Sequence, residues 1–188
     1  MNAFFVSTAV VAIGEIGDKT QLLALLLAAR FKRPVPILLG ILFATLANHT
    51  LAGLLGEWVR SLISPDILRW VLGLSFFAVA AWALVPDKMD VEPSSTGNYG
   101  VFFVTLVTFF LAEIGDKTQV ATMMLAAKYH DLIAVVAGTT LGMMLADAPA
   151  VLLGEIAALK ISFKVVRYVA AALFALLGLA VLYGFKGL

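Results

Sequence analysis

Six stretches of apolar residues, separated by short polar connections, dominate the hydrophobic pattern of this chain. They cover about residues 3–29, 35–59, 70–85, 101–127, 132–157 and 165–183. Most are close to the ~20 residues that a helix needs to cross the ~30 Å hydrocarbon core of a bilayer. A backbone in lipid must satisfy its own hydrogen bonds, so each stretch is predicted to be a helix. The pattern therefore predicts an all-α polytopic membrane protein with six transmembrane helices.

The amino-acid composition also indicates a membrane protein. Hydrophobic residues make up 62% of the chain and charged residues only 13%, and the mean hydropathy is +1.03. Soluble domains average roughly 45–50% apolar and 25% charged residues. The net charge of +1 is spread over short loops and leaves no basic stripe, which argues against a nucleic-acid partner. The absence of cysteine excludes thiolate metal ligands and cysteine nucleophiles.

A charged heptapeptide interrupts the first apolar stretch and occurs again in the fourth. The sequence Glu-Ile-Gly-Asp-Lys-Thr-Gln spans Glu15 to Gln21 and, letter for letter, Glu113 to Gln119. An Asp or Lys at the centre of a membrane helix costs ~2.5–3.5 kcal/mol on insertion scales. Intramembrane acids of this kind usually mark an ion pathway. The repeated motif is therefore predicted to be functional.

The motif belongs to a longer internal repeat with an offset of 98 residues. The same offset places Gly40 on Gly138 and Arg69 on Arg167. Three predicted helices per copy is an odd number, so the second copy must enter the membrane from the opposite side. Inverted repeats of this kind are typical of secondary transporters. We predict one membrane domain over residues 1–188, with two inverted three-helix repeats at 1–85 and 101–188 and a linker at 86–100.

Helical spacing suggests that the motif residues share a face. The Glu and Asp of each motif are three residues apart, and the Gln extends their face by another turn. The glycine between them permits close helix approach or local unwinding. If both motifs meet at the repeat axis, their oxygens would suit Mn²⁺, Ca²⁺ or Mg²⁺ better than Cu⁺ or Zn²⁺. The expected ligands from the motifs are Glu15, Asp18, Gln21, Glu113, Asp116 and Gln119.

Two further polar residues stand at one depth in the second and fifth apolar stretches. Asn48 and His49 align with Ala146 and Asp147 under the repeat offset. Asp147 could complete a metal shell or relay protons, and Asn48 could be a ligand or an interhelical hydrogen-bonding residue. We include Asn48 and Asp147 among the candidate metal ligands.

Charge counting connects this cluster to proton exchange. Four ionised motif carboxylates and two protonated lysines would leave a net charge that one divalent cation neutralises. An empty site cannot keep all its carboxylates ionised in a low dielectric, so protons and metal should displace each other. A purely structural alternative is that Glu15–Lys19 and Glu113–Lys117 form salt bridges within each helix. That alternative would give no role to the aspartate of either motif.

At these residues the chain resembles a family of small six-helix membrane proteins with paired E-x-G-D-K-T/S motifs. This family includes bacterial manganese exporters of the MneA type and relatives in chloroplast and Golgi membranes. The resemblance covers essentially the whole chain. It implies Mn²⁺ export, in some members Ca²⁺ transport, coupled to H⁺, with Glu15, Asp18, Glu113 and Asp116 as the metal-binding core. It also implies a bacterial inner-membrane location.

Several alternatives stay open at this point. A Ca²⁺/H⁺ exchanger would use nearly the same ligands as a manganese exporter. An intramembrane aspartyl protease would need two aspartates but not the paired Glu, Lys and Gln. An exporter of lysine or another small molecule would have fewer central carboxylates. We expect a transporter, not an enzyme, with no cofactor beyond the transported Mn²⁺ or Ca²⁺; a homodimer is left open.

Overall fold

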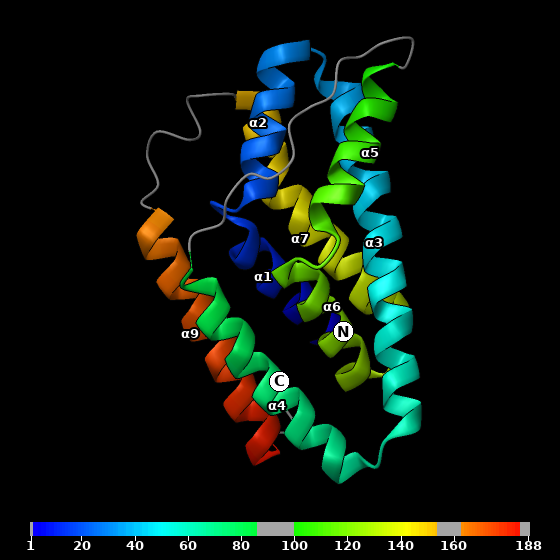
Figure 1. The fold of residues 1–188 in the computed structure, drawn as a ribbon, viewed down its shortest axis with the longest axis vertical. Coiled ribbons are helices and arrows are strands. Elements are labelled where there is room, and N and C mark those ends of the chain that lie inside the picture. The colour runs from blue at the N-terminus through cyan, green and yellow to red at the C-terminus, as the bar shows by residue number, and fades with distance from the viewer. Residues whose placement is uncertain (1, 86–99, 154–162, 185–188) are drawn as a thin grey trace.

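The chain folds into helices throughout the part that the structure describes. This computed structural model describes residues 2–85, 100–153 and 163–184. Within these ranges every regular element is a helix (Figure 1). The helices are α1 (Asn2–Glu15), α2 (Lys19–Phe31), α3 (Pro34–Leu62), α4 (Pro65–Ala83), α5 (Val101–Glu113), α6 (Lys117–Tyr129), α7 (Leu132–Leu153) and α9 (Phe163–Tyr183).

Four helices are long and apolar enough to cross a membrane. They are α3, α4, α7 and the Lys164–Tyr183 part of α9, and they match four of the six predicted stretches. The predicted polar connection over 60–69 was too long, because α3 continues to Leu62 and α4 begins at Pro65. Proline suits a first helical turn, where its missing N–H costs nothing. The predicted linker, except for Gly100, and the end of the fifth predicted stretch lie outside the described residues.

The first and fourth predicted stretches are not continuous helices, which corrects the prediction. Each divides into two shorter helices, α1 with α2 and α5 with α6, and the break falls inside the charged motif. Gly17 and Gly115 stand in these breaks with φ of 80° and 74°. Glycine adopts this left-handed region without the steric cost that other residues bear. Of the two effects expected of the glycine, local unwinding is the one observed.

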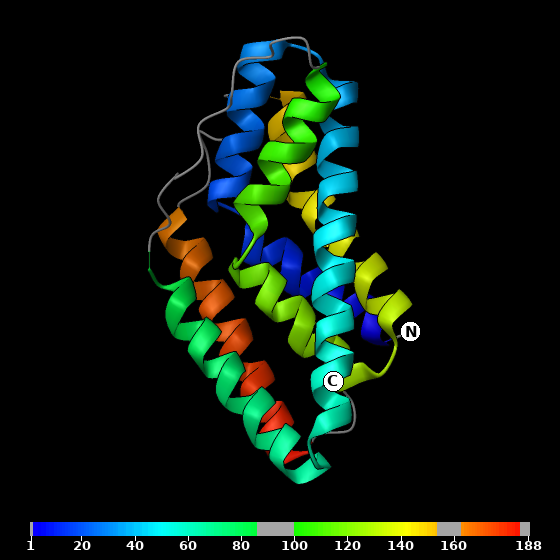
Figure 2. The same ribbon diagram turned by 45° about the vertical axis from the view of Figure 1, so that its right-hand side comes forward.

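Helices from the two halves of the chain cross each other. Helix α1 packs mainly on α7, and α5 packs mainly on α3, while α4 lies beside α9 (Figures 1 and 2). A Cβ added to Gly138 would collide with the backbone of Phe4, and one added to Gly40 would collide with Phe102 and Thr105. The aligned glycines therefore permit two equivalent close crossings between the halves.

Two hydrophobic clusters stabilise the bundle on either side of the breaks. One joins α4, α9 and α6 through side chains such as Phe76, Leu125 and Phe174. The other joins α2, α3 and α5 through Leu23, Ile41 and Phe109. Both breaks lie near mid-height along the long axis of the molecule (Figure 2). The charged motifs thus occupy a middle layer between two apolar ones.

Large apolar side chains also cover the outside of the bundle. Exposed examples include Phe43, Trp58, Trp70, Leu74, Leu145 and Leu176. Soluble monomers rarely expose contiguous apolar patches of more than a few hundred Å². These outer faces are suited to contact with lipid.

Candidate metal centre

Each motif is carried by a helix end and the start of the next helix. Glu15 is the last residue of α1, and Asp18 is the N-cap of α2, where its carboxylate accepts a hydrogen bond from its neighbour's backbone N–H at 2.8 Å. Glu113 and Asp116 hold the same positions at the end of α5 and the start of α6. Aspartate is a favoured N-cap because it satisfies a free N–H and complements the helix dipole. The single-helix face expected for each Glu–Asp pair was therefore wrong in its geometry.

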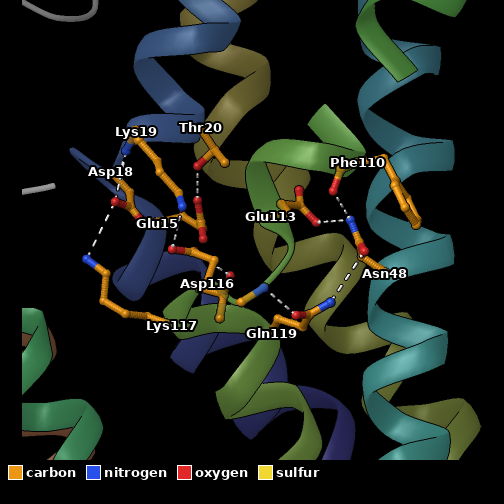
Figure 3. Close-up of polar contacts among 12 residues, drawn as sticks. Glu15, Asp18, Lys19, Thr20, Asn48, Phe110, Glu113, Asp116, Lys117 and Gln119 are labelled. Carbon is orange, nitrogen blue, oxygen red and sulfur yellow. Dashed lines mark hydrogen bonds and ion pairs between the residues drawn. The ribbon is translucent and has the colours of Figure 1, made fainter. Parts of the chain in front are cut away.

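Carboxylates from both motifs meet in the middle of the molecule. Glu15, Asp18 and Asp116 each offer an oxygen, and these oxygens lie within 4.8 Å of one another (Figure 3). All three side chains are buried, with 0%, 2% and 1% of their residue surface exposed. Glu113 is equally buried but lies to the other side of this trio, toward α3 (Figure 3). The two distant motifs are thus brought together into one acidic cluster.

The motif lysines pair across the two copies. The Lys19 ammonium lies 3.4 Å from a carboxylate oxygen of Asp116, and the Lys117 ammonium lies 3.5 Å from one of Asp18. The salt bridges considered from the sequence would instead have joined each lysine to the glutamate of its own motif. Each aspartate faces a lysine from the other half of the chain. These cross-pairs link the breaks and partly compensate the clustered negative charge.

The two glutamines brace the breaks. The amide oxygens of Gln21 and Gln119 accept hydrogen bonds from the backbone N–H groups of Gly17 and Gly115, at 2.8 and 2.7 Å. The Gln21 side chain also donates to the carbonyl oxygen of Ala146 on α7, at 2.8 Å. In this arrangement both glutamines tie an unwound segment to a helix of the opposite half. Their role as metal ligands stays a prediction.

The two glutamates differ in their hydrogen bonds. Glu113 accepts from the Thr45 hydroxyl at 3.0 Å and from the Asn48 amide at 3.4 Å, both on α3. Glu15 accepts on one oxygen from the hydroxyl of Thr20 in its own motif. The other Glu15 oxygen is buried and has no hydrogen-bond partner among the described residues. This oxygen is available to a ligand.

Asn48 and Asp147 both lie next to the acidic cluster, and their role as metal ligands stays a prediction. Asn48 donates to the carbonyl oxygen of Phe110 at 3.0 Å and accepts from Gln119 at 3.3 Å, so it joins α3 to the second motif (Figure 3). Asp147 on α7 is fully buried and interacts electrostatically with Glu113 and Asp18. Within the described part of the chain neither Asp147 oxygen has a hydrogen-bond partner. Asp147 thus adds a fifth carboxylate to the cluster.

Thr20 and Thr45 were not among the residues expected at the site. Both hydroxyls donate to a central glutamate. The available signal for Thr45 was its position three residues before Asn48, which puts both on one helical face. A lone threonine in an apolar helix carries little information, because its hydroxyl is usually satisfied by its own backbone.

A small cavity reaches the cluster beside Asp18. It has a volume of about 10 Å³, and its lining includes Gly17, Lys117 and, from α9, Arg167. This is roughly the space that one water molecule requires. The cluster itself is an all-oxygen set of carboxylates, which suits a hard divalent cation.

Comparison with known proteins places the chain in a family context. The family model described as "Divalent cation/proton antiporter GDT1" matches residues 3–91 and 101–187. The Vibrio cholerae protein named "Putative manganese exporter" is 51% identical over 181 residues, covering 96% of this chain and 90% of that protein. "GDT1-like protein 3" from Oryza sativa subsp. indica is 30% identical, covering 92% of this chain and 71% of its own length. No solved structure matches this chain.

Proposed function

Since the chain belongs to the GDT1 family of divalent cation/proton antiporters, we propose that it exports Mn²⁺ in exchange for protons across a bacterial inner membrane. Membership makes it a multi-pass membrane transporter and not an enzyme, which removes the aspartyl protease alternative. The resemblance to manganese exporters drawn from the motifs is confirmed at the level of the family.

One observation carries this proposal. Three buried carboxylates from both motifs offer oxygens within 4.8 Å of one another, midway between two apolar layers. Lys19 and Lys117 offset the charge of Asp116 and Asp18, but three ionised carboxylates still leave the trio with an excess negative charge. An uncompensated buried charge is costly, so such a trio suits a site that a cation fills. We assign Glu15, Asp18 and Asp116 as the core ligands, and we propose that the neighbouring carboxylates of Glu113 and Asp147 join them when a cation binds. Gln21, Asn48 and Gln119 act in our proposal mainly by holding the breaks in place.

Proton coupling follows from the same charges. The cluster contains five buried carboxylates, and two of them pair with the motif lysines. Full ionisation of the other three would place excess negative charge in a low dielectric. A divalent cation offsets this excess, and protons must offset it when the cation leaves. The lysine ammonium groups already neutralise Asp18 and Asp116 in this arrangement. Metal entry would therefore displace lysines and protons together.

Alternating access would come from the repeat. We propose six membrane crossings arranged as two inverted three-helix repeats, with the broken pairs α1–α2 and α5–α6 as the first crossing of each. Broken helices that place ligands at the membrane midplane are a recurring feature of secondary transporters. Matching breaks at Gly17 and Gly115 and matching crossings at Gly40 and Gly138 support this arrangement.

Calcium is the alternative substrate. Carboxylate oxygens suit Ca²⁺ as well as Mn²⁺, and the family description specifies only a divalent cation. The name of the Vibrio relative favours manganese. A Ca²⁺/H⁺ exchanger would use the same core ligands.

Metal flux in proteoliposomes with an imposed pH gradient tests the function. Mn²⁺, Ca²⁺, Mg²⁺ and Zn²⁺ are compared one at a time, and proton movement is followed with a pH-sensitive dye. We expect Mn²⁺ flux that depends on the gradient and is lost in Asp116→Asn. Glu57→Gln, near the end of α3, is the matched control and should transport normally. Flux of neither Mn²⁺ nor Ca²⁺ in the wild-type chain would refute the proposal.

A further inference from the structure

A basic pocket lies at the end of the bundle where α3 ends, α4 begins and α6 ends. Its volume is about 360 Å³. Its charged and titratable lining residues are Arg60, Arg69, Lys128 and His130, with no acidic residue among the lining that the structure describes. We propose that this pocket binds the phosphate headgroup of an anionic phospholipid. This site is separate from the carboxylate cluster and from the transported cation.

The charge of the pocket calls for an anion. Arg60 has a buried Nε atom without a hydrogen-bond partner among the described residues. The Lys128 ammonium lies 4.7 Å from the centre of the Tyr129 ring and donates a hydrogen bond to the hydroxyl of the same tyrosine at 3.4 Å. Neither contact neutralises its charge. A phosphate accepts several hydrogen bonds from arginine and lysine at once and would supply the missing counter-charge.

The rest of the lining favours a lipid over a free phosphate ion. Leu68 and Leu72 of α4 and Val181 of α9 form an apolar wall beside the cations. Trp70 is 54% exposed near the start of the same helix, and tryptophan is enriched at the headgroup level of membranes. Basic residues at a helix end next to an apolar wall match a headgroup followed by an acyl chain. Basic pockets between membrane helices bind anionic headgroups in this way.

The position of the pocket would allow a bound lipid to hold several helices together. In Figure 2 the lower ends of α3, α4 and α9 converge at one end of the molecule. The pocket lining comes from α3, α4, α6 and α9, and therefore joins the α4–α9 pair to the helix that follows the second motif. A bound lipid would bridge these elements. We expect it to stabilise the packing of α4 and α9 against α6.

The test is a lipid titration of the detergent-purified, delipidated protein, and it requires no metal. Phosphatidylglycerol, phosphatidylcholine and inorganic phosphate are added separately, while the thermal midpoint and the bound mass in native mass spectrometry are recorded. We expect phosphatidylglycerol alone to raise the midpoint and to remain bound. In the double variant Arg60→Gln/Arg69→Gln its affinity should fall on the order of tenfold or more, since each basic residue near a headgroup contributes measurably.

Arg33→Gln is the matched control, because Arg33 is exposed at the α2–α3 connection and does not line the pocket. It should bind phosphatidylglycerol like the wild-type chain. Equal binding in the double variant, or equal stabilisation by phosphatidylcholine, would overturn the proposal. Equal stabilisation by inorganic phosphate would identify a small-anion site and overturn the lipid assignment. If the double variant does not fold, Lys128→Gln provides the same comparison.

Discussion

The two motifs have the same seven residues but different surroundings. In the second motif, Glu113 accepts hydrogen bonds from Thr45 and Asn48 on α3. The aligned positions on α7 are Met143 and Ala146, and neither side chain has a hydroxyl or amide to offer Glu15. Glu15 therefore relies on Thr20 of its own motif and keeps one oxygen without a hydrogen bond from the described residues.

This difference shows that the motif alone does not define the site. The crossing helix from the opposite half decides whether a glutamate is satisfied within the protein or left available to a cation. In this conformation we assign the Glu15 side to the metal and the Glu113 side to structural support. Three sets of substitutions test these unequal roles, beginning with the proposed ligand and ending with a neighbouring residue.

Replacing the two glutamates separately should have the largest effect. Glu15→Gln removes a proposed ligand and should weaken Mn²⁺ binding by more than about 100-fold, beyond the 10–100-fold that outer-shell partners typically contribute. Glu113→Gln should weaken it by about tenfold or less. Equilibrium Mn²⁺ binding to the purified protein measures both. Equal losses in the two variants would contradict the assignment of unequal roles.

Removing the support of Glu113 should act mainly on stability. Thr45→Val keeps the shape of the side chain but deletes the donor to a buried carboxylate, at a cost of about 1.5–3 kcal/mol in the free energy of unfolding. Thr122→Val is the control, since the buried Thr122 hydroxyl donates only to the carbonyl oxygen of Thr118 within the same helix. Chemical denaturation in detergent compares them. A loss no greater in Thr45→Val than in Thr122→Val would show that the Glu113 hydrogen bond is unimportant.

Making the two sides alike should have the smallest effect. Met143→Thr places on α7 the residue that α3 has at Thr45, and would give Glu15 a second donor. We expect Mn²⁺ affinity to fall about threefold to tenfold, the equivalent of roughly 1 kcal/mol for one hydrogen bond. Met124→Leu, in the hydrophobic cluster, should leave affinity unchanged. An unchanged affinity in Met143→Thr would show that position 143 does not influence Glu15.

The residues near this site could be predicted from the sequence better than their arrangement in space. Apolar stretches, duplicated acids and polar residues such as Asn48 and Asp147 are visible directly in the chain. The helix breaks were only suggested by Gly17 and Gly115, because the apolar pattern runs on through both motifs. The pairing of Lys19 with Asp116 could not be predicted, since it depends on which helices cross. That information lies in contacts between residues about 100 positions apart.

The crossing of α1 with α7 also fixes an order of assembly during synthesis. Helix α1 emerges from the ribosome before α7, which carries its close partner around Gly138. Contacts between such distant segments form late, because their ends must first be brought together. Until α7 is made, the Glu15 end of α1 lacks the helix that packs against it. The first half of this protein therefore cannot form all of its buried contacts alone, and we expect the two halves to fold together.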